Sequence, residues 1–170
     1  SDPVPPHDLV IQASPAYPAV AGGFTFGFVG GVPQYRWYWA QPTTPIPFDE
    51  LRANWVNFGD TSEELHILLP ASDTTWTIDL AFGDIFDDHY SQLLRLTDAD
   101  DNVLVEYDQS PAAGHAIDAA GNSVPVSDWD NQKQTRQLYI PGNLLKVKLG
   151  RPGVDSHSSL RYIRVLGEEQ

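Results

Sequence analysis

Short runs of alternating apolar and polar residues recur along the chain, and turn residues separate them. The clearest run is Thr75–Phe82, where polar or small residues alternate with four large apolar ones, Trp76, Ile78, Leu80 and Phe82. Because successive side chains of a β-strand point to opposite faces, this period of two indicates a strand with one buried face. No segment shows a convincing apolar stripe at helical spacing. The pattern therefore predicts an all-β fold.

The same alternation marks further strands, and Gly, Pro, Asp and Asn mark the turns between them. The expected strands are Leu9–Ile11, Phe24–Phe28, Tyr35–Trp39, Leu65–Leu69, Gln92–Thr97, Val103–Tyr107, Arg136–Ile140, Leu144–Leu149 and Leu160–Leu166. Asp98–Asn102 is expected to form a hairpin turn, Phe48–Asn54 a single helical turn, and Gln109–Asn131 a functional loop or a small hairpin. About nine or ten strands without crossover helices predict two packed antiparallel sheets, a β-sandwich.

A chain of 170 residues, 41% of them hydrophobic, is long enough to bury one sizeable core. Ser1–His7 is Pro-rich and without periodicity, which is typical of an interdomain linker. We therefore expect residues 1–7 to be a linker remnant and residues 8–170 to form a single domain.

Acidic residues outnumber basic ones 23 to 10, which gives a formal net charge of −13. Such a surface repels phosphate groups, so a nucleic acid or an anionic membrane is not an expected partner. The chain has no Cys, which excludes disulfides, a thiol nucleophile and a zinc–thiolate site. An acidic chain without Cys or Met suits an exposed, oxidising location, and we expect a secreted or cell-surface protein.

Signatures of catalysis are sparse. The chain has no G-x-S-x-G elbow, no Gly-rich phosphate loop and no H-E-x-x-H motif. The sequence Asp155-Ser156-His157-Ser158 is interpreted as a turn, because adjacency in sequence is not the spatial triad of acyl transfer. The many carboxylates do not exclude a glycosidase-type acid/base pair, and Asp79 is the nearest candidate for it. Its place on the polar face of a strand favours a surface position instead. No catalytic residue is predicted.

An acidic cluster follows the best strand directly, and it holds Asp84, Asp87 and Asp88. Oxygen ligands packed this closely suit Ca²⁺, which takes six to eight of them. The competing interpretation is a solvated acidic loop.

The aromatic residues carry the binding hypothesis, because exposed Trp and Tyr rings stack on the apolar faces of sugars. Trp129 stands between Asp128 and Asp130 in a polar segment, with no apolar neighbour to demand burial. Tyr90 beside His89, and Trp55 within Ala53–Asn57, are further candidates expected in loops. Trp76 shares a face with aliphatic residues and is expected in the core instead.

The order of several short motifs resembles a known family. These are Phe24-Thr25-Phe26-Gly27, Asp49-Glu50-Leu51, Phe82-Gly83-Asp84, then His89, and the closing L-R-Y-I-R-V that begins at Leu160. The order is similar to that of galactose-binding-like, malectin-like β-sandwich modules appended to bacterial polysaccharide-degrading enzymes. The resemblance implies a jelly-roll carbohydrate-binding module, often with a structural Ca²⁺. Asp84 and His89 match family positions, the aromatic platform does not align, and the Asp98–Asn131 region is longer than the family's.

We expect, from these observations together, a non-catalytic carbohydrate-binding module that targets an attached enzyme to a polysaccharide, linked to neighbouring domains and otherwise monomeric. Two alternatives stay open. One is a structural or adhesion domain of a cell-surface protein, and the other is a small β-sandwich lyase or esterase. Aromatic residues exposed together on one face would favour the first interpretation over the second.

Overall fold

The computed structural model describes residues 7–11, 15–31, 34–37, 53–58, 64–70, 75–82, 93–108, 115–117, 123–125, 133–149 and 157–167. None of them belongs to a helix long and apolar enough to cross a membrane.

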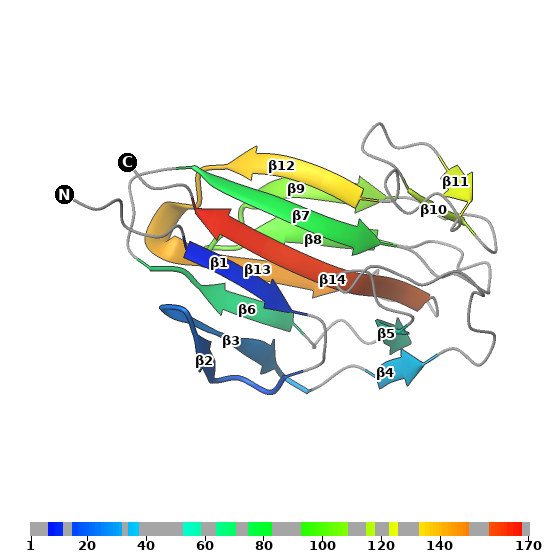
Figure 1. Ribbon diagram of the computed structural model, residues 1–170, viewed down its shortest axis with the longest axis horizontal. Coiled ribbons are helices and arrows are strands. Elements are labelled where there is room, and N and C mark those ends of the chain that lie inside the picture. The colour runs from blue at the N-terminus through cyan, green and yellow to red at the C-terminus, as the bar shows by residue number, and fades with distance from the viewer. Residues whose placement is uncertain are drawn as a thin grey trace.

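The first sheet has six strands, and its order is β12–β7–β14–β5–β4, with β1 also paired to β14. The bounds are β1 His7–Ile11, β4 Gln34–Trp37, β5 Ala53–Phe58, β7 Trp76–Phe82, β12 Lys133–Leu138 and β14 His157–Gly167. One side of β14 pairs with β7. Its other side pairs with β5 along the first half and with β1 along the last half, as Figure 1 shows.

The second sheet also has six strands, in the order β2–β3–β6–β13–β8–β9. The bounds are β2 Ala19–Ala21, β3 Phe24–Val29, β6 Glu64–Leu68, β8 Leu93–Thr97, β9 Val103–Asp108 and β13 Leu144–Leu149. A short 3-10 turn, η2 Pro141–Asn143, precedes β13. A separate two-stranded hairpin consists of β10 His115–Ile117 and β11 Ser123–Pro125. All of these strand pairs are antiparallel.

The core lies between the two sheets and follows the alternation of the sequence. In β7 the side chains of Trp76, Ile78 and Leu80 are buried, while the intervening positions are only half-buried. In β13 the buried residues Leu145 and Val147 alternate with lysines in the same way. Burial of such apolar faces against each other holds the two sheets together.

The two ends of the sandwich differ (Figure 1). At one end the register pairs His7 with Gly167, so the first and last described strands meet there. The hairpin from β2 to β3 also turns there, through Gly22 and Gly23, whose positive φ angles of 57° and 86° suit a two-residue hairpin loop. At the other end lie β4, β5, the β10–β11 hairpin and the last residue of β7, Phe82, and we call it the loop end.

The prediction of an all-β fold with two antiparallel sheets is confirmed. Several boundaries differ from expectation. Strand β1 begins at His7, which the sequence analysis placed in the linker, because His7 extends the ladder with β14. Ala53 and Asn54 lie in β5 and not in a helical turn, because they pair with β4. Strand β12 begins at Lys133, earlier than expected, because it pairs along the whole of β7 up to Ala81.

Candidate functional site

Most of the predicted site residues lie outside the described residues. These are His89, Tyr90, Asp128, Trp129 and Asp130 for the ligand, and Asp84, Asp87 and Asp88 for the metal. Trp55 is the exception, and the expectation that it lies in a loop was wrong. Its backbone lies in β5, where it pairs with Leu160 of β14, so it is not a loop residue.

The sheet register nevertheless fixes the strand ends from which the candidate segments leave. Leu160 of β14 pairs with Trp55 on one side and with Phe82 on the other. Next to Phe82, Ala81 pairs with Lys133, the first residue of β12. Neighbouring strands lie about 4.8 Å apart, so Trp55, Phe82 and Lys133 form a row across the loop end of the first sheet.

The stretch Gln109–Asn131, expected as a functional loop or a small hairpin, contains the hairpin of β10 and β11. Strand β10 contacts β7, the strand that ends at Phe82. The hairpin therefore lies beside the strand from which the acidic segment starts.

The motif Asp155-Ser156-His157-Ser158 was interpreted as a turn, and this is wrong for its second half. His157 and Ser158 are the first residues of β14 and pair with Phe58 and Asn57. The ladder with β5 holds them in extended backbone.

A second polar region lies on the outer face of the second sheet, and the described side chains form a network there. The Nε2 atom of His66 lies 3.3 Å from Oε2 of Glu64, and Oε1 of Glu64 lies 3.8 Å from Nζ of Lys148. Lys148 and Lys146 both donate to one atom, Oδ1 of Asp101, at 2.7 Å and 3.1 Å. These donors hold the pKa of Asp101 at about 2, with Lys148 the larger cause.

Tyr17 borders this network and keeps 37% of its surface exposed. Its ring meets the ring of His66 edge-on, with centroids 6.3 Å apart. Its N–H donates to the carbonyl of Phe28 at 3.1 Å. The backbone of Tyr17 occupies the place where a Cβ on Gly27 would lie, and Gly27 has a φ of 142°. The glycine thus allows the segment to lie flat on the sheet.

Arg95 of β8 lies on the same outer face, paired in register with Lys148 on one side and Glu106 on the other. Its Nε atom is buried and has no hydrogen-bond partner within the described part of the chain. We call the set Tyr17, Glu64, His66, Arg95, Asp101, Lys146 and Lys148 the outer strip.

The outer strip is not predicted by the local sequence patterns. Its charged members occupy the polar positions of E-L-H-I-L and L-L-K-V-K-L, which by themselves predict only a solvated face. They lie close together because β6, β13 and β8 are neighbours in the sheet, and local alternation does not predict which strands are neighbours. One signal was available, since Gly27 inside the Phe24–Phe28 run indicates a close approach of another backbone.

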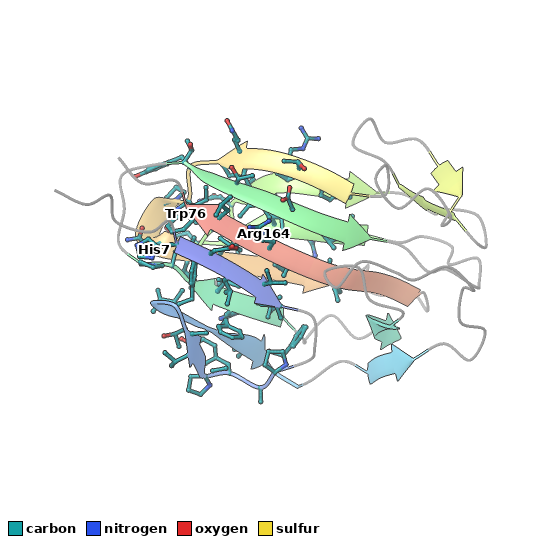
Figure 2. The ribbon with its side chains drawn as sticks, in the orientation of Figure 1. His7, Trp76 and Arg164 are labelled. Carbon is teal, nitrogen blue, oxygen red and sulfur yellow. The ribbon has the colours of Figure 1, made fainter. Side chains whose placement is uncertain are left out.

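The outer face of the first sheet carries two separate pairs. Thr135 donates to Oδ1 of Asp79 at 2.6 Å, so Asp79 is engaged on the surface as its pattern predicted. Arg164 binds both carboxylate oxygens of Asp8, at 2.9 Å and 2.8 Å, and this hydrogen bonding lowers the pKa of Asp8. Figure 2 shows Arg164 on β14, between β7 and β1.

The predicted turn at Asp98–Asn102 is confirmed. Oδ1 of Asp98 accepts from the backbone N–H groups of Asp100 and Asn102, both at 2.9 Å, and Oδ2 accepts from the Asn102 side chain at 3.0 Å. The Asn102 side chain is the largest cause of the lowered pKa of Asp98. Asp98 therefore caps its own turn. Among the described residues no three His, Asp or Glu side chains come close enough to hold a metal ion.

β12 and β9 are edge strands of the two sheets. Arg136 of β12 lies over the ring of Tyr107 in β9, with its guanidinium carbon 6.0 Å from the ring centroid. Burial raises the pKa of the Tyr107 hydroxyl, and Arg136 acts in the opposite direction. This pair closes one edge of the core.

Comparisons with known proteins give few matches. No model of a known protein family matches the sequence, and a search of curated proteins finds no match either. Among solved structures, the chain is similar to the enzymatically active domain of tailspike protein 4 from bacteriophage CBA120, with a TM-score of 0.30 and 8% sequence identity. The match covers 94% of this chain and 19% of the tailspike chain, so this chain spans about a fifth of it. Similarity at this level supports no inference about function.

Proposed function

We propose that this domain is a non-catalytic carbohydrate-binding module that targets an attached enzyme to a polysaccharide. The supporting observation is the row of Trp55, Phe82 and Lys133 across the loop end. The segment that holds Asp84, His89 and Tyr90 follows Phe82, and the segment that holds Trp129 precedes Lys133.

Covalent geometry limits how far those candidates lie from the row. An extended chain spans about 3.5 Å per residue, so Asp84 is within about 7 Å of Phe82 and Trp129 within about 14 Å of Lys133. Phe82 and Lys133 end neighbouring strands. The segment after Phe82, which holds Asp84, and the segment before Lys133, which holds Trp129, are therefore both attached at the same end of the sandwich.

The residue types suit a sugar. An indole ring offers an apolar face to the C–H groups of a pyranose, and carboxylates accept hydrogen bonds from its hydroxyls. Trp129 with Asp128 and Asp130 combines both, and His89 and Tyr90 add polar and aromatic groups from the segment after β7. Binding of this kind needs no catalytic residue, and none is proposed.

A calcium ion would suit the acidic segment in the same proposal. Asp84, Asp87 and Asp88 would supply carboxylate oxygens within five consecutive positions. The ion would hold the segment after β7 in one conformation and so order the neighbouring His89 and Tyr90. Its proposed role is structural.

The net charge of −13 supports an exported, monomeric domain that binds neither nucleic acid nor membrane. A neutral polysaccharide is not repelled by this charge. The proposed partner is therefore a polysaccharide outside the cell, with further domains linked covalently.

The test is retention on affinity gels that contain plant, algal or microbial polysaccharides. Trp129→Ala is expected to weaken binding about tenfold, because a lost stacking contact of about 1.4 kcal/mol is a factor of ten. Tyr139→Ala serves as the control, since Tyr139 is 58% exposed and follows β12 at the end opposite the loops. Absence of wild-type retention on every gel would favour a structural or adhesion domain. Equal retention of wild type and Trp129→Ala would place the site elsewhere.

A further inference from the structure

We propose that the outer strip of the second sheet is a second carbohydrate-contacting surface, specific for an oligosaccharide that carries a carboxylated sugar. It rests on the proposed function but uses none of the loop-end residues. The ring of Tyr17 would stack on one sugar, and Arg95 would bind the carboxylate of another.

Tyr17 is a fixed aromatic platform and not a loosely exposed side chain. Besides the bond from its own N–H, the adjoining Pro15 carbonyl accepts from the N–H of Phe28 at 2.8 Å. Gly27 leaves room for this segment, and the ring rests edge-on against His66. An exposed ring held in place by the sheet costs little conformational entropy when a ligand stacks on it.

The polar partners are held in place as well. The side chains of Lys146 and Lys148 are only 14% and 18% exposed, and they share a single carboxylate oxygen of Asp101. His66 is held by Glu64. Lys148 also lies 3.8 Å from Oε1 of Glu64, so the charges of this cluster nearly cancel and do not add to the negative charge of the chain.

Arg95 is the group that specifies a carboxylate. Its Nε has no acceptor within the described part of the chain, so no internal carboxylate already occupies that donor. A guanidinium presents donors in a planar fork that matches a carboxylate. Lys148, its neighbour in register, places a second cation beside it, while Glu106 lies on the edge-strand side.

The charge distribution points to the same ligand class. The outer strip holds three of the ten Lys and Arg residues of the chain. Glu64 and Asp101 of the strip and the neighbouring Glu106 balance them, so the rest of the chain carries the whole formal net charge of −13. A ligand carboxylate is therefore repelled less at the outer strip than on the rest of the surface.

The spacing of the two groups requires more than one sugar. Tyr17 lies over β3, and Arg95 is on β8, three strands away through β6 and β13. At about 4.8 Å per strand this is roughly 14 Å. A chain of sugars laid across the strands covers this length, whereas a monosaccharide contacts only one of the two groups.

The experiment compares retention on gels of polygalacturonate and of its methyl ester, which keeps the sugar backbone and masks the carboxylates. A buffer with 0.15 M salt has a screening length of about 8 Å, which suppresses repulsion from distant acidic residues but preserves direct contacts. The wild type is expected to prefer polygalacturonate. Arg95→Gln should abolish this preference, and Tyr17→Ala should weaken binding to polygalacturonate about tenfold.

Two controls separate binding from folding. Tyr17→Phe keeps the ring and should bind as the wild type does, and Tyr139→Ala should also be unaffected. Equal melting temperatures of wild type and Arg95→Gln would show that the fold is intact. If Arg95→Gln unfolds, binding of Tyr17→Ala and Tyr17→Phe to polygalacturonate is compared instead. Weaker binding by Tyr17→Ala alone supports the inference, and equal binding by both overturns it.

The outcomes distinguish this surface from the loop end. A preference for polygalacturonate that Arg95→Gln retains, or unchanged binding by Tyr17→Ala, overturns the inference. A loss confined to Trp129→Ala also overturns it but supports the proposed function. Losses in Tyr17→Ala and Arg95→Gln, with none in Trp129→Ala, support the inference and contradict the loop-end site.

Discussion

Replacement of Trp76 by Ala tests the packing at the end of the core opposite the loops. Trp76 is 1% exposed and is the largest of the fully buried side chains. Its ring lies 5.7 Å from the ring of Phe24 and 6.1 Å from that of His7. Figure 2 shows Trp76 and His7 together at this end. A Cβ on Gly167 would collide with the indole, so the strand β14 packs directly on it.

The magnitude follows from this environment. Truncation of a buried Trp to Ala costs about 3–5 kcal/mol, because apolar contacts are lost and a cavity remains. Domains are stable by about 5–15 kcal/mol, so the change removes a large fraction of the total. For a domain of this size each kcal/mol shifts the melting temperature by about 2–4 °C, which predicts a fall of roughly 6–20 °C.

Urea unfolding followed by far-UV circular dichroism measures the effect without relying on tryptophan fluorescence. Trp76→Phe keeps an aromatic ring and should cost less than Trp76→Ala. The surface change Tyr139→Ala should leave the free energy of unfolding within about 0.5 kcal/mol of the wild type. A cost below about 1 kcal/mol for Trp76→Ala would refute the argument that the indole fills the space between β1, β3 and β14.

Two further predictions concern charge. If Asp84, Asp87 and Asp88 bind Ca²⁺, then calcium at one hundred times its Kd should add about 2.7 kcal/mol to the free energy of unfolding. A chelator should reverse this gain. A melting temperature that calcium and chelator leave unchanged would contradict the metal site. The pKa of Asp101 falls from 3.8 to about 2 on folding, so its contribution is present above pH 3.8 and is lost as the pH falls toward 2. Urea unfolding at several pH values should show a smaller acid loss for Asp101→Asn than for wild type, and equal losses would contradict the assigned role of Lys146 and Lys148.

The fold class could be predicted because burial in a sandwich imposes a period of two on each strand. Thr75–Phe82 and Leu144–Leu149 display it clearly, and their apolar residues are the core residues in the structure. Strand β2 was missed because Ala19–Ala21 is too short to show alternation. Strand β5 was missed because Ala53–Phe58 mixes aromatic, aliphatic and Asn residues without a clear period.

The candidate sites were harder to predict, because each depends on which strands are neighbours. Trp55 and Phe82 come together only through Leu160, far along the chain. Lys146, Lys148 and Asp101 form one cluster because β13 lies beside β8, which leads into the turn that holds Asp101. Local patterns specify which face of a strand is buried, whereas the partner of each strand depends on the whole chain.

The two proposed surfaces lie on different parts of the described fold. His7 pairs with Gly167, so the chain enters and leaves the described fold at the end opposite β4, β5 and the last residue of β7. The outer strip runs across β6, β13 and β8 on the face that points away from the core. A polysaccharide could then contact the loop end and the outer strip of the same molecule, and two weak sites joined in this way bind more tightly than either alone.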